Sequence, residues 1–92
     1  MGRYAGKYSR NIDSTHREVV AAFRAAGWTV FQTARLGSGV PDLVCAKAGR
    51  TVCVEVKGPK TKVTAQQQSW HADWPGETAI VRTVADVMAL SR

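Results

Sequence analysis

The chain has 92 residues, of which 45% are hydrophobic, and its 13 lysines and arginines against 7 acidic residues give a net charge of +6. This length predicts one domain and no second one, no apolar run approaches the ~18 residues of a membrane span, and the charged N-terminus does not resemble a secretory signal. We therefore expect an intracellular, cytoplasmic protein that makes no membrane contact and binds a polyanionic partner.

The first part of the chain is expected to change from an arm to a helix. Residues 1–12 are basic, contain glycine and lack periodicity, which favours a flexible N-terminal arm. Capping residues at 13–15 and apolar residues at helical spacing then predict a helix over residues 14–26, which Gly27 ends. A single folded domain is expected over residues 13–92.

Three strands are expected in the middle of the chain. Aromatic and β-branched residues predict a strand over 28–35, and a glycine-rich loop follows at 37–41. Residues 42–47 and 51–57 predict two antiparallel strands, because a tight turn at 48–50 separates them.

Two helices and a strand are expected in the last third. Thr64 and Gln67 have the spacing of a capping box at the start of a helix, which Pro75 ends. A buried strand over 79–82 and a helix over 83–90 follow. The order helix, strand, strand, strand, helix, strand, helix predicts an α/β fold with a mixed sheet flanked by helices.

Two carboxylates and a lysine are expected to meet in the predicted hairpin. A turn of two or four residues should place Asp42 opposite Lys57, and alternation along the strands then puts Asp42, Glu55 and Lys57 on one face of the sheet. A turn of odd length would spoil this arrangement, because a slip of one residue turns every side chain to the other face.

This arrangement predicts the hydrolysis of phosphodiester bonds. Buried charges must be paired or bound to metal, and paired carboxylates suit Mg²⁺, which lowers the pKa of a bound water. Lys57 would steady the attacking water or the charge that develops on phosphorus. The alternative is a structural salt bridge between Asp42 and Lys57, with Glu55 in solvent.

Four segments carry a resemblance to a known family. They are Gly39-Val40-Pro41-Asp42-Leu43-Val44, Gly49-Arg50, Glu55-Val56-Lys57-Gly58-Pro59-Lys60 and Thr64-Ala65-Gln66-Gln67-Gln68-Ser69-Trp70. Together they resemble the PD-(D/E)XK nuclease superfamily and, more narrowly, its VRR-NUC branch. The resemblance runs from about residue 13 to residue 90.

The resemblance implies a restriction-endonuclease-like core and dependence on Mg²⁺, for which Mn²⁺ substitutes, with no small-molecule cofactor. It implies Asp42 and Glu55 as metal ligands and Lys57 as the catalytic lysine. It also implies Glu18 as a further catalytic and metal-binding residue and Gln67 as an active-site glutamine. Both follow a threonine by three residues, so each could instead only close a capping box.

Basic residues around the hairpin and in the N-terminal arm are candidates for phosphate contacts. Such contacts give salt-dependent binding without reading sequence, and the alternative is a scattered, solvated surface. The candidate nucleic-acid-binding residues are Lys60, Lys62, Arg35, Ser38, Arg50, Arg3, Lys7 and Arg10.

The expected function is a metal-dependent DNA endonuclease that selects branched DNA or Holliday junctions. Stand-alone members of the resembled branch are small, often viral (including phage) or bacterial, and act as homodimers on branched DNA; a viral member would act in the host cytoplasm. Trp70 and Trp74 lie on one face of the second helix and either pack on the sheet or join a dimer interface. Two alternatives stay open: a catalytically silent nucleic-acid-binding module, and a nuclease subunit that needs a partner for targeting.

Overall fold

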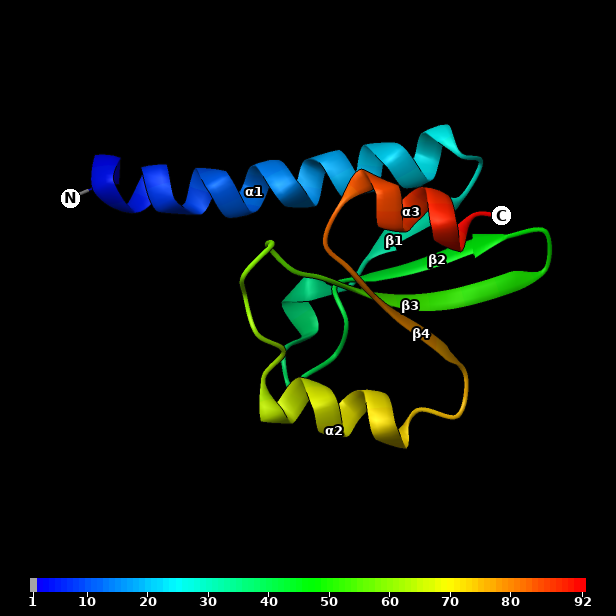
Figure 1. Cartoon of the computed structure of the whole chain (residues 1–92). Helices are drawn as coiled ribbons and strands as arrows, with labels where there is room; N and C mark the ends of the chain where they lie inside the picture. Colours follow the sequence, from blue (N-terminus) through cyan, green and yellow to red (C-terminus); the bar gives the residue numbers. More distant parts are fainter. Residues whose placement is uncertain (1) are drawn as a thin grey trace.

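The computed structural model describes the backbone of residues 2–92 and the side chains of residues 14–92. Its elements follow in the predicted order, with a short 3-10 helix added after the first strand (Figure 1). They are α1 (Gly2–Ala25), β1 (Thr29–Gln32), η1 (Ala34–Leu36), β2 (Leu43–Lys47), β3 (Arg50–Val56), α2 (Ala65–Asp73), β4 (Glu77–Val81) and α3 (Val84–Leu90).

Helix α1 begins much earlier than predicted. It starts at Gly2, so the expected start at residue 14 is wrong, and residues 2–12 of the expected flexible arm lie in this helix. The physical reason is that this segment contains no proline, and glycine costs only about 1 kcal/mol in a helix. The side chains of residues 2–13, among them the predicted DNA contacts Arg3, Lys7 and Arg10, lie outside the described part.

The four strands form one mixed sheet in the order β1-β2-β3-β4. The pairs β1–β2 and β2–β3 are antiparallel, whereas β3 and β4 run parallel. A parallel pair needs a crossover connection, and here α2 provides it. Helices α1 and α3 cover one face of the sheet and α2 lies on the other (Figure 1). The predicted α/β fold with a mixed sheet is confirmed.

The hydrophobic core lies between the sheet and the α1–α3 pair. Phe23 of α1, Leu43 of β2, Val54 of β3 and Val87 of α3 are all fully buried there. Trp28 contacts Phe23 edge to face, with ring centroids 5.6 Å apart. By contrast, α2 has no buried residue, so the sheet face beneath it is more open and can hold polar groups.

The β2–β3 hairpin has a two-residue turn, Ala48-Gly49, in which both residues have positive φ. Such a turn pairs the residues that flank it directly, and this register, continued by one residue beyond β2, places Asp42 opposite Glu55. The expected pairing of Asp42 with Lys57 is therefore wrong by two residues. Because the turn length is even, the predicted common face for the three charged residues is retained.

Two strand boundaries also differ from the prediction. The first strand ends at Gln32, because the backbone turns into η1 directly after Thr33. The last strand begins at Glu77, two residues early, where its pairing with Val52 of β3 starts. Within the described part of the chain, no helix is long and apolar enough to cross a membrane.

Candidate active site

Two carboxylates meet at the end of the hairpin that lies away from its turn. Asp42 directly precedes β2, and its Oδ2 accepts a hydrogen bond of 2.9 Å from the backbone N–H of Val56. Glu55, which lies next to last in β3, is only 3% exposed. One carboxylate is thus anchored to the end of β3, and the other is buried beside it.

The backbone around Pro41 and Asp42 is held in place by Thr33. The buried Thr33 hydroxyl donates to the Pro41 carbonyl oxygen at 2.7 Å, and the Thr33 N–H donates to the Asp42 carbonyl oxygen at 2.7 Å. Gly39 approaches α2 so closely that a Cβ there would lie 2.7 Å from the Gln66 carbonyl oxygen. The loop before Asp42 therefore requires glycine at this position, where φ is +80°.

The Glu55 carboxyl has an unfavourable environment for its charge. Burial, followed by the charge of Asp42, raises the pKa of Glu55 to about 7, although the Lys57 ammonium opposes this shift. The Lys57 Nζ lies 3.8 Å from Glu55 Oε2, and Glu55 Oε1 is buried without a hydrogen-bond partner. A nearby cation would relieve both the unpartnered oxygen and the repulsion between the two carboxylates.

Gln67 reaches Glu55 from α2. Its side-chain Nε2 donates to Glu55 Oε2 at 2.9 Å. At the same time its Oε1 accepts from the Thr64 N–H at 2.9 Å, and its N–H donates to Thr64 Oγ1 at 3.1 Å, which completes the predicted capping box. The predicted capping box is therefore present, and the same side chain also contacts Glu55. The role of Gln67 as an active-site glutamine stays a prediction.

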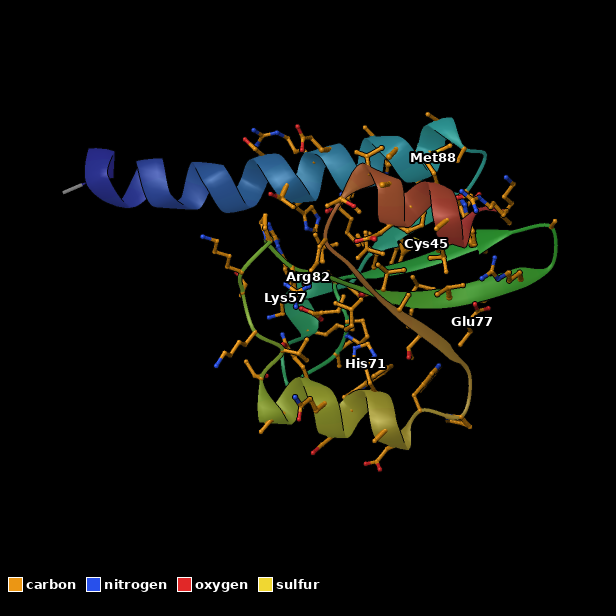
Figure 2. All side chains as sticks on the ribbon, in the orientation of Figure 1. Cys45, Lys57, His71, Glu77, Arg82 and Met88 are labelled. Atoms are coloured by element: carbon orange, nitrogen blue, oxygen red, sulfur yellow. The ribbon has the colours of Figure 1, made fainter. Side chains whose placement is uncertain are left out.

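Arg82 holds the loop that follows Lys57. Its Nη1 donates to the carbonyl oxygens of Gly58 at 2.6 Å and Thr61 at 2.7 Å, and the Lys57 N–H donates to the Val81 carbonyl oxygen at 3.0 Å. Figure 2 shows Lys57 and Arg82 at one end of the sheet. Arg82 is not among the residues predicted from the sequence, although an arginine directly after an apolar strand could have indicated such a role.

The structure does not bring every predicted residue to this group. Glu18 lies exposed on α1, the helix that covers the opposite face from α2. Among residues 14–92, no three histidine, cysteine, aspartate or glutamate side chains gather closely enough to hold a metal. This geometry gives no support to Glu18 as a third metal ligand, a role that stays a prediction.

Arg50 also lies away from the carboxylates, at the turn of the hairpin. Its guanidinium forms an ion pair with Glu77, donates to the Leu90 carbonyl oxygen at 2.6 Å and lies over the Trp28 ring. Figure 2 shows Glu77 at the other end of the sheet from Lys57. The structure thus gives Arg50 structural contacts, in place of a position beside the carboxylates.

Four of the predicted nucleic-acid contacts are exposed on the loops that lead into and out of the site. Arg35 in η1 and Ser38 in the next loop precede Asp42, whereas Lys60 and Lys62 follow Lys57. A phosphate backbone could reach these positions without unfolding any element. Their contact with nucleic acid stays a prediction.

The residues present fit a divalent cation. Asp42 and Glu55 offer carboxylate oxygens side by side, and one of these is buried and unpartnered. Mg²⁺ binds through one or two carboxylates, with water and substrate phosphate as its other ligands, so a third acidic residue is not needed.

Comparison with known proteins assigns the family. The family model described as VRR-NUC domain matches residues 6–86. The chain belongs to the VRR-NUC domain family. This domain is part of the PD-(D/E)XK nuclease superfamily, so the resemblance seen in the sequence is confirmed. The family makes this chain a nuclease domain, for which DNA is the expected partner and divalent metals are the general cofactors.

A solved structure described as a VRR_NUC domain supports the assignment. It shares 25% sequence identity with this chain at a TM-score of 0.71, and the match covers 85% of this VRR-NUC chain and 90% of the solved one. No curated protein matches this chain closely enough to count as a relative.

Proposed function

We propose that this VRR-NUC domain is a metal-dependent endonuclease that hydrolyses phosphodiester bonds in branched or otherwise structured DNA. The observation that carries the proposal is the pair formed by Asp42 and the buried Glu55, whose Oε1 has no hydrogen-bond partner. A structural salt bridge would leave neither an unpartnered carboxylate oxygen nor a carboxyl whose pKa is raised to about 7.

Asp42 and Glu55 would hold the cation, which we expect to be Mg²⁺ with Mn²⁺ as a substitute. When bound, such a cation lowers the pKa of a water and stabilises negative charge on a phosphate. The chain's own groups then orient the reactants. Gln67 keeps the Glu55 carboxylate in one orientation through its 2.9 Å hydrogen bond, and Lys57 directs its ammonium to the attacking water or the charge on phosphorus.

The selection of structure over sequence follows from the residues around the site. Lys60, Lys62 and Arg35 are exposed and would contact phosphates, which carry no sequence information. No helix-turn-helix or other base-reading element is recognisable in the sequence. DNA shape and strand pairing would therefore decide which sites are cut.

A homodimer would bring two such sites to two strands. Trp70 of α2 and Trp74, which directly follows this helix, are stacked with ring centroids 4.8 Å apart, and Trp74 is 43% exposed. Tryptophan is enriched at the energetic centres of interfaces. The exposed Trp74, stacked on the half-buried Trp70, supports an interface at the end of α2 in preference to packing on the sheet.

A panel of substrates tests the proposal. The purified protein is incubated with four-way-junction, flap, linear duplex and single-stranded DNA, in Mg²⁺ or EDTA, with Asp42→Ala as a control for contaminating nuclease. We expect Mg²⁺-dependent cuts in the branched substrates by the wild type alone. Binding without cleavage would instead indicate a silent module or a missing partner, and full activity of Glu18→Gln would remove Glu18 from the metal site.

A further inference from the structure

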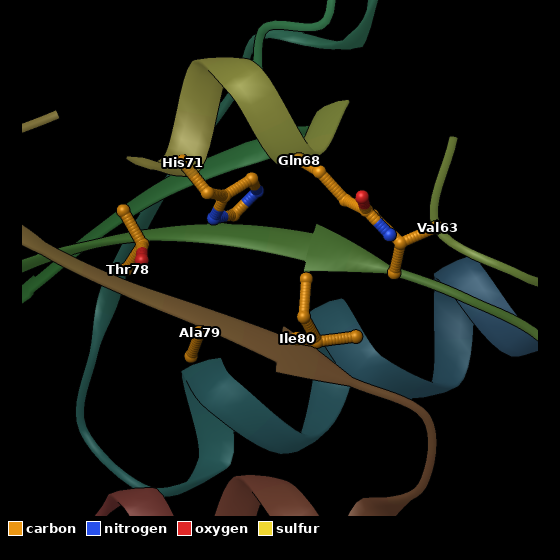
Figure 3. A pocket seen from close by; sticks show the side chains of 6 residues that line it. All are labelled: Val63, Gln68, His71, Thr78, Ala79 and Ile80. Atoms are coloured by element: carbon orange, nitrogen blue, oxygen red, sulfur yellow. The ribbon is translucent and has the colours of Figure 1, made fainter. Parts of the chain in front are cut away.

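A pocket of about 370 Å³ lies between α2 and the edge strand β4 (Figure 3). Apolar side chains and hydrogen-bonding groups share its wall. The lining residues are Val63, Gln68, His71, Thr78, Ala79 and Ile80. The pocket is an open one, so a planar group of moderate size can enter it from solvent.

His71 supplies an unsatisfied hydrogen-bonding atom to this pocket. Figure 3 shows its ring directed from α2 toward β4, and its Nε2 is buried without a partner. In the described part of the chain, only one other buried side-chain nitrogen or oxygen lacks a partner, and it is Glu55 Oε1. Since buried polar atoms almost always find partners, both atoms point to ligands that complete them.

The pocket adjoins the two carboxylates. Ile80 pairs with Glu55 in the parallel β3–β4 ladder, so their side chains are neighbours on the same face of the sheet. On α2, Gln68 directly follows the residue that touches Glu55, and Val63 directly follows Lys62. Residues that line the pocket are therefore direct neighbours of the carboxylate site and of the loop that carries Lys60 and Lys62.

The apolar wall, the unsatisfied histidine nitrogen and the nearby lysines together suit a nucleotide. We propose that the pocket binds an unstacked nucleobase of the DNA strand whose phosphate lies at Asp42 and Glu55. Apolar groups such as Val63 and Ile80 would contact the faces of the base, and His71 would stack on it or hydrogen bond its edge, as aromatic residues do with splayed-out bases.

The inference rests on the proposed function and names the substrate feature that this site selects. Bases inside a duplex are stacked and paired, so only a flap, a branch point or a single strand offers one at low cost. Charge favours this occupant over an apolar side chain of a second copy, because the exposed Lys60 and Lys62 lie in the loop that leads directly into Val63 of the pocket and would hold the flanking phosphates. The pocket thus supplies the selectivity that phosphate contacts lack.

Binding to two flap substrates tests the pocket. The duplex is identical in both, but one flap carries normal bases and the other carries abasic residues, and binding is followed by fluorescence anisotropy in EDTA. We expect the wild type to prefer the flap with bases by about tenfold, the usual effect of one stacked base. Thr78→Trp, which fills the pocket, should remove this preference.

The matched control is Thr29→Trp, the same substitution at an exposed position of the opposite edge strand β1, which should retain the preference. His71→Ala makes a side chain smaller, so it cannot disturb the fold by overfilling the pocket. It should lower the preference for the flap with bases severalfold. Equal binding of both flaps by the wild type, or an unchanged preference in both pocket variants, would overturn the inference. The binding assay needs no cleavage, so the two proposals can fail separately. If the protein cuts DNA but binds both flaps equally, only the proposed base pocket is refuted. If it prefers the flap with bases but shows no Mg²⁺-dependent cutting, only the proposed nuclease activity is refuted.

Discussion

Gln67 donates a hydrogen bond to Glu55 Oε2 at 2.9 Å while its own carbonyl oxygen caps the start of α2 at Thr64. The cap fixes where α2 begins, and the same side chain fixes how Glu55 is oriented. The position of the helix and the geometry of the carboxylate are therefore coupled through one residue.

Two variants separate these roles. Gln67→Glu can still close the capping box but replaces the amide donor by a third carboxylate beside Asp42 and Glu55, so we expect α2 to persist and the cleavage rate to fall about 10- to 100-fold. Thr64→Ala should do the reverse and cost about 1 kcal/mol of stability with most activity retained. Single-turnover cleavage and thermal melting measure both. A Gln67→Glu variant with the wild-type rate would contradict the assigned contact.

Glu55 should make the metal-free protein less stable as the pH rises. Its pKa is about 7 in the folded state and 4.5 ordinarily, so between these values the folded state keeps a proton that the unfolded chain has released. The free energy of unfolding should thus decrease from about pH 4.5 to about pH 7, by about 3 kcal/mol from this group.

Urea unfolding in EDTA at pH 5 and pH 8 measures this effect, with Glu55→Gln as the reference that cannot titrate. We expect the variant to lack the decline, and a divalent cation to restore the stability of the wild type at pH 8. The same pH dependence of stability in both proteins would show that folding does not raise the pKa of Glu55.

Arg82 is expected to act as a positioning residue for the loop after Lys57. Arg82→Ala removes the hydrogen bonds to Gly58 and Thr61, and we expect kcat to fall about tenfold, the lower end for lost supporting contacts, with partial rescue in Arg82→Lys. The matched control is Arg50→Ala, which should lower the melting temperature without changing kcat. Equal effects of the two alanine variants on kcat would make Arg82 merely structural.

Lys60 is expected to contact phosphate. Lys60→Ala should weaken DNA binding at low salt and reduce the slope of log affinity against log salt by about one unit. Lys47→Ala is the control, since the Lys47 ammonium is bound to the Ala26 carbonyl oxygen at the far end of the hairpin. If the two variants change the slope equally, Lys60 has no specific place in the interface.

Patterns within short segments were enough to predict the order of elements and the shared face of the charged residues. Strand alternation alone puts Asp42, Glu55 and Lys57 on one face for any even turn, so this prediction was correct although the facing pairs were not. The exact pairing depends on the positive φ of Ala48 and Gly49, which composition does not reveal.

Contacts between distant segments were beyond the sequence analysis. The hydrogen bond from Thr33 to Pro41 and those from Arg82 to the loop after Lys57 exist only once the sheet has formed. Helical periodicity similarly assigns Glu18 to a helix but not to a face of the sheet, and the structure leaves it exposed. Long-range packing, which no local pattern encodes, decided these cases.

The most direct test of the central claim is the cleavage of a flap substrate by the wild type and by Glu55→Gln, each in Mg²⁺ and in EDTA. If Asp42 and Glu55 hold the catalytic cation, only the wild type in Mg²⁺ will cut, while Glu55→Gln remains folded and binds the DNA. Cleavage by Glu55→Gln at the wild-type rate, or undiminished cleavage in EDTA, would contradict the assignment of this site.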